Sequence, residues 1–95
     1  MSYRVEKIMS ISRGEFDASL AALDPSAKLS PTGFANVTCA GVNAEIKFQE
    51  LPARVLGGLL TLPQASVRIT IADATDAQAA EFLRRFDIAF QRGGG

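Results

Sequence analysis

Residues 66–90 read SVRITIADATDAQAAEFLRRFDIAF, and this stretch contains the clearest strand signal of the chain, followed directly by a helix signal. Val67, Ile69 and Ile71 alternate with polar residues, which predicts a strand with one buried face. Thr75 and Gln78 have the spacing of a capping box and predict the start of a helix. The helix continues to about residue 91 with one apolar stripe, formed by Ala79, Phe82, Leu83, Phe86 and Phe90. Gly93 is expected to cap it in the left-handed conformation.

A second strand and helix are predicted near the N-terminus. Residues 3–11 alternate imperfectly and favour a strand, although Lys7 falls on its apolar face. Ser12 and Glu15 form another capping box, so we expect a helix over residues 13–23. Asp24-Pro25 ends this helix, because a residue that precedes proline is disfavoured in the α region.

The middle of the chain predicts further strands joined by short connections. Residues 34–39 and the alternating run from residue 44 to 50 read as strands, with a turn at Ala40-Gly41. Pro52 and Pro63 bracket a shorter strand over residues 54–62, which the Gly57-Gly58 pair weakens. The pair itself is expected to be a strand bend or bulge.

These elements predict an α+β fold in the order strand, helix, four strands, helix. The sheet is expected to be mostly antiparallel with about five strands, and both helices are expected to cover one of its faces. Residues 1–92 form a single domain on this interpretation, and residues 93–95 form a short glycine tail. The opposite, wet face of the sheet would carry five charged side chains: Arg4, Glu6, Glu45, Lys47 and Arg68.

This order of elements resembles the repeat unit of the TATA-box-binding-protein fold, and it is also similar to a minimal helix-grip fold. Separately, the run LPARVLGGLLTLPQASVRITI at residues 51–71 and the ending FLRRFDIAFQRGGG look like those of small uncharacterised bacterial proteins of unknown function. That resemblance implies a bacterial protein but carries no activity with it, because a shared fold does not define a function.

Composition argues against several classes of function. Ten basic and ten acidic side chains balance to a net charge of zero, whereas nucleic-acid and anionic-membrane binders usually carry a basic excess. The chain has no histidine and one cysteine, so it lacks the usual ligands of a zinc site and the parts of a histidine-based catalytic triad. We therefore expect no metal and no cofactor. We also expect a protein of the cytoplasm, because the chain has a single thiol, no apolar run long enough to span a bilayer and no signal peptide.

The function most consistent with these features is a small non-catalytic module that binds a protein partner, a second copy of itself or an apolar ligand. The candidate contact segment is apolar on both faces and consists of Val55, Leu56, Leu59, Leu60 and Leu62. A strand with this pattern must be covered by something, such as a dimer partner. The alternative is that the segment curls beneath the two helices and belongs to the core.

Three other functions stay open at this point. An enzyme, or an accessory subunit of one, would rely on groups such as Lys7, Glu50 and Asp73, although each also has a structural interpretation. Cys39 is expected to be a small buried apolar residue rather than a reactive thiol. Nucleic-acid binding would use the wet face and Arg84, Arg85 and Arg92, whose charges are offset by acidic neighbours. Finally, the terminal Arg92-Gly93-Gly94-Gly95 resembles the ends of ubiquitin-like and sulfur-carrier proteins, whose β-grasp fold begins differently.

Overall fold

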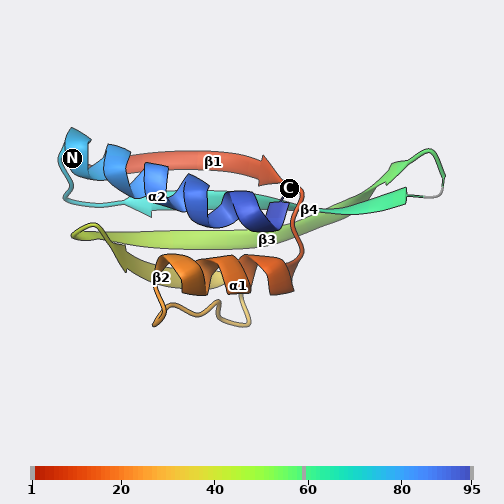
Figure 1. The fold of residues 1–95 in the computed structure, drawn as a ribbon, viewed down its shortest axis with the longest axis horizontal. Helices are drawn as coiled ribbons and strands as arrows, with labels where there is room; N and C mark the ends of the chain where they lie inside the picture. The colour runs from red at the N-terminus through yellow and green to blue at the C-terminus, as the bar shows by residue number, and fades with distance from the viewer. Residues whose placement is uncertain (1, 59, 95) are drawn as a thin grey trace.

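Strands and helices follow one another in the order β-α-β-β-β-α in the computed structural model, which describes residues 2–58 and 60–94. The elements are β1 (Tyr3–Met9), α1 (Arg13–Leu23), β2 (Phe34–Cys39), β3 (Val42–Leu56), β4 (Leu60–Ile71) and α2 (Asp76–Gly94). The strands form one antiparallel sheet in the spatial order β1-β4-β3-β2. The α+β class and the antiparallel sheet are therefore confirmed (Figure 1).

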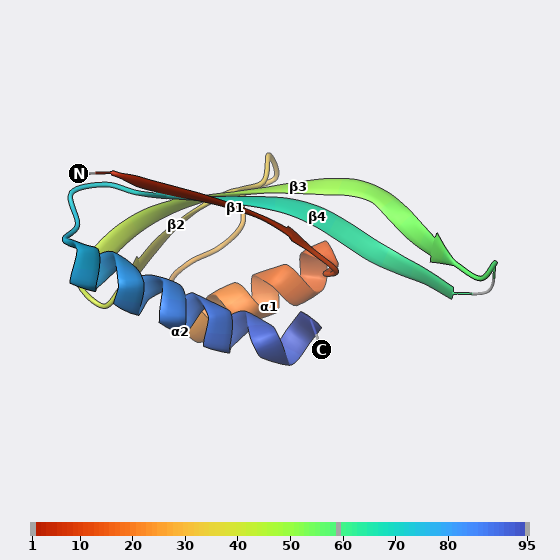
Figure 2. The same ribbon diagram turned by 90° about the horizontal axis from the view of Figure 1, so that it is seen from above.

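Both helices cover the same face of the sheet, as predicted, and the opposite face is open (Figure 2). Side chains alternate across a strand, so one set of each strand points to the helices. The inward sets of β4 and β3 include Val67, Ile69, Ile71 and Ile46, each of which is fully buried. Phe16 of α1 packs on Phe48 of β3, with ring centroids 4.7 Å apart. Four stripe residues of α2 complete this core: Ala79, Phe82, Phe86 and Phe90.

Both predicted capping boxes are present. The Glu15 backbone N–H donates to Ser12 Oγ over 3.2 Å, and the Glu15 carboxylate accepts from the Ser12 N–H over 3.0 Å. The same reciprocal pair joins Thr75 and Gln78 at 3.1 and 2.9 Å. These bonds satisfy N–H groups that a helix leaves unpaired at its first turn, which is why the predicted helix starts are correct.

The predicted fifth strand over residues 54–62 is wrong. Its first part is the end of β3 and its last part is the beginning of β4, so the chain reverses direction within the segment. Gly57 and Gly58 have φ angles of 63° and 74° and form a turn rather than a strand bend. Backbone with positive φ is accessible to glycine at little cost, and paired positive φ angles favour a hairpin. The chain therefore has one strand fewer than the order on which the resemblances to the TATA-box-binding-protein repeat and to the helix-grip fold are based.

Two other boundaries differ from prediction. Strand β1 ends at Met9 rather than at residue 11, where Ile11 already packs in the core before α1. Helix α2 continues to Gly94, so Gly93 lies within the helix and does not cap it. The Ala40-Gly41 turn is confirmed, since both residues have positive φ and link the paired ends of β2 and β3.

Candidate functional site

The most prominent feature of the molecule is a two-stranded hairpin that projects beyond the helices (Figures 1 and 2). We call residues 51–63 the arm. It exists because β3 and β4 are 15 and 12 residues long, whereas their outer neighbours β2 and β1 have only 6 and 7. The arm gives the molecule a long axis of 46 Å against 23 and 22 Å for the other two.

A β-bulge marks the base of the arm and accounts for its two prolines. Leu51 pairs with Gln64 and Arg54 pairs with Leu62, so two residues of β3, Pro52 and Ala53, face the single Pro63 of β4. Proline has no N–H to donate to a ladder and is tolerated in strands at bulges or edges. Pro52 and Pro63 are therefore accommodated here, although the sequence favoured reading each of them as the end of a strand.

The arm exposes apolar side chains on both faces. The pairing of β3 with β4 places Leu56, Leu60 and Leu62 on one face and Val55 with Thr61 on the other. Val55 is 64% exposed, Leu60 is 54% exposed and Leu56 is 36% exposed, while Leu62 is half-buried. Leu59, the fifth residue of the predicted contact segment, lies outside the described residues. The alternative that this segment curls beneath the helices is wrong, because the arm points away from them (Figure 2).

The open face of the sheet carries the predicted charges. One row across it consists of Glu6, Arg68, Lys47 and Phe34, and the next consists of Arg4, Thr70, Glu45 and Asn36. Arg68 Nε donates to Glu6 Oε1 over 3.0 Å, and Lys47 Nζ lies 5.5 Å from the centre of the Phe34 ring. Three cations and two carboxylates leave this face with one excess positive charge. That is weak for phosphate binding, which needs a concentrated positive field.

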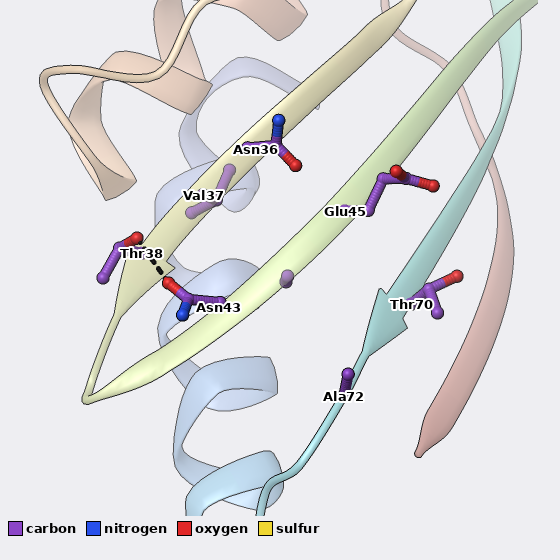
Figure 3. Close-up of a pocket in the computed structure, with 8 residues that line it drawn as sticks. Asn36, Val37, Thr38, Asn43, Glu45, Thr70 and Ala72 are labelled. Atoms are coloured by element: carbon purple, nitrogen blue, oxygen red, sulfur yellow. Dashed lines mark hydrogen bonds between the residues drawn. The ribbon is translucent and has the colours of Figure 1, made fainter.

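A shallow hollow of about 440 Å³ lies on the same face, across the ends of β2, β3 and β4 (Figure 3). Its rim includes the polar side chains of Asn36, Asn43 and Glu45, which stand on the open side of the sheet. Thr38 Oγ1 donates to Asn43 Oδ1 over 2.8 Å, so the two side chains at one end bind each other. This arrangement is an ordinary cross-strand polar pair beside a concave stretch of sheet.

The candidate catalytic groups are not brought together. Lys7 Nζ lies 2.8 Å from Asp87 Oδ1 of α2 and 5.8 Å from the centre of the Phe86 ring. Glu50 lies on the helix-facing side of β3, as predicted from the alternation, because its pairing partner on β4 is the fully buried Ala65, but the Glu50 side chain itself is exposed. Asp73 follows the end of β4 at Ile71, whereas Glu50 pairs with Ala65, six residues before that end, so about 20 Å of strand lies between the two positions.

Cys39 is partly exposed rather than fully buried. It lines a groove of about 300 Å³ between the helices, together with Leu23 of α1 and Ile88, Ala89 and Arg85 of α2. Glu81, and to a smaller extent the neighbouring Cys39, raises the pKa of the Arg85 guanidinium above its usual value.

Arg84 and Arg85 of α2 share one carboxylate, that of Glu81. Glu81 accepts two hydrogen bonds from Arg84 and one from Arg85, each 2.8 Å long. These bonds lower the pKa of the Glu81 carboxyl to about 2. The Arg92 side chain lies outside the described residues. The acidic neighbour predicted to offset the charges of this helix is thus present for Arg84 and Arg85, whereas Asp87 pairs with Lys7.

Asp24 has a structural role that the sequence did not reveal. Its carboxylate accepts hydrogen bonds from the Ser26 N–H, the Ser26 hydroxyl and the Thr38 N–H at 3.0, 2.8 and 2.9 Å. The bond from Thr38, followed by those from Ser26, lowers the pKa of Asp24. This buried side chain therefore ties the end of α1 to β2. A bond between residues 24 and 38 leaves no periodic signal, so only the Asp-Pro helix stop was visible.

No family model, curated protein or solved structure matches this chain. Within residues 2–58 and 60–94, no three acidic or cysteine side chains gather in a way that could hold a metal ion. The helices of this described part are also too short or too polar to cross a membrane. Within the described chain, the arm is the feature whose apolar side chains are least accounted for by packing in the core.

Proposed function

We propose that this protein is a non-catalytic interaction module whose contact surface is the arm. A two-stranded hairpin is only marginally stable by itself in water, and one with leucine and valine on its faces exposes apolar surface at a cost. Exposed apolar clusters on soluble domains commonly mark binding sites for proteins.

One observation carries the proposal: three of the six large apolar side chains that are exposed in the described chain belong to the arm. These are Val55, Leu56 and Leu60, whereas Ile8, Phe34 and Ile88 are scattered over three other elements. Single exposed apolar residues are normal on a protein surface, but a group on one projecting element is not. Arg54 is the one charged residue of the arm, so the free energy needed to remove water from its side chains on binding is small.

Affinity capture tests the proposal. The bait is the full chain, compared with the arm variant Leu56→Ser/Leu60→Ser and with the control Ile8→Ser, which removes an exposed apolar residue from β1 instead. A protein retained by the wild type and the control but lost from the arm variant supports the arm as the contact surface. Retention of the same protein by the arm variant contradicts it.

A further inference from the structure

We infer that the occupant of the arm is a second copy of this chain, whose own arm packs on it face to face in a two-fold symmetric dimer. This inference rests on the proposed function and adds the identity of the partner. Three observations carry it: the excess surface of one chain, the prolines and the bulge that interrupt the edges of the arm at its base, and the scarcity of charge on its faces.

The chain exposes more surface than its mass requires. Its accessible surface is 5855 Å², whereas a compact monomer of 10.1 kDa exposes about 5,300 Å². Its radius of gyration of 13.6 Å likewise exceeds the value of about 12.4 Å expected for its length. Two chains that each bury this excess of roughly 550 Å² approach the lower limit of about 1,200 Å² for a stable interface.

The edges at the base of the arm are poor sites for the addition of a strand. Pro52 and Pro63 lack an N–H, and the bulge between Leu51 and Arg54 breaks the regular ladder. Prolines and bulges of this kind prevent edge-to-edge pairing of exposed strands. Beyond the bulge the arm offers only three paired residues on each edge, so a partner gains more from the side chains on the faces, where Leu56 and Leu60 stand opposite each other.

A leucine face is complementary to its own copy. In a two-fold dimer the same patch meets itself, so a charged patch repels its copy, whereas an uncharged apolar patch does not. Arg54, on the same face as Leu62, is long enough to extend its guanidinium to the rim. The net charge of zero also removes overall repulsion between two copies.

Sedimentation velocity with the full chain over a wide range of concentration tests the dimer. The wild type and the Ile8→Ser control are expected to approach twice the mass of 10.1 kDa as concentration rises. Leu56→Ser/Leu60→Ser should weaken the dimer on the order of a hundredfold, because it removes apolar contacts at the centre of the interface twice. Unchanged circular dichroism and melting temperature verify that this variant is folded.

Several outcomes overturn the inference. A wild type that stays monomeric at every concentration refutes the dimer, and so does an arm variant that dimerises as well as the control. A monomeric wild type that sediments with vesicles of mixed zwitterionic and anionic phospholipid identifies a lipid surface as the occupant instead. A monomer that still captures another protein through its arm refutes the dimer but leaves the proposed function standing.

Discussion

Removing the arm should leave the folded domain nearly as stable as before. Leu51 and Gln64 are direct partners across the hairpin, so replacing residues 52–63 with Asn-Gly closes β3 onto β4 through a two-residue turn. Among the described residues, the buried core and the side chains packed on it include no arm member. We therefore expect the free energy of unfolding to change by no more than about 1 kcal/mol.

The comparison variant is Phe86→Ala, which removes a ring that is 1% exposed and stacked on Phe90 at 4.1 Å. Its loss should cost about 3–5 kcal/mol. Urea denaturation measures both changes, and small-angle scattering should give a radius of gyration near 12 Å for the shortened chain against 13.6 Å for the whole one. A shortened chain that loses several kcal/mol would refute the reasoning, because the arm would then be part of the fold.

Three further predictions concern the domain itself. Gly33→Ala should lower the free energy of unfolding, measured by urea denaturation, by at least about 2 kcal/mol, because φ at this position is +89° and a Cβ would lie 2.3 Å from a β3 carbonyl oxygen. Gly14→Ala is the matched control: there is open space around Gly14, so this change should be neutral or slightly stabilising. Because folding lowers the pKa of Asp24, the ionised carboxylate stabilises the folded state fully above the pKa that Asp24 has in the unfolded chain. This stabilisation is lost as the pH falls through the pKa that Asp24 has in the folded state. Asp24→Asn should therefore lower the melting temperature at neutral pH, and the difference from wild type should shrink below about pH 4; a difference that persists in acid would contradict this. A double-mutant cycle on the Lys7–Asp87 pair should yield less than about 1 kcal/mol of coupling, because both side chains are partly exposed.

The helices and the sheet could be predicted because their signals are local. Ser12 with Glu15 and Thr75 with Gln78 mark helix starts through bonds three residues apart, and the alternation around Ile69 marks a buried strand face. These patterns were sufficient to assign both helices to one face of an antiparallel sheet.

The arm could not be predicted because its signals point in two directions. Pro52 and Pro63 usually end strands, but a bulge accommodates both, and a bulge is defined by pairing that a single strand does not display. The Gly57-Gly58 pair fits a bend as well as a turn until the partner strand is known. Exposure of Leu60 depends on where the helices end in space, which periodicity does not specify.

The most direct test of the arm as a contact surface is amide NMR of the full chain, recorded from dilute to concentrated solution. We expect resonances of residues 51–63 to shift with concentration while those of β1 and α2 stay in place. Shifts confined to the groove beside Cys39 or to the open sheet face, with the arm unchanged, would contradict the account.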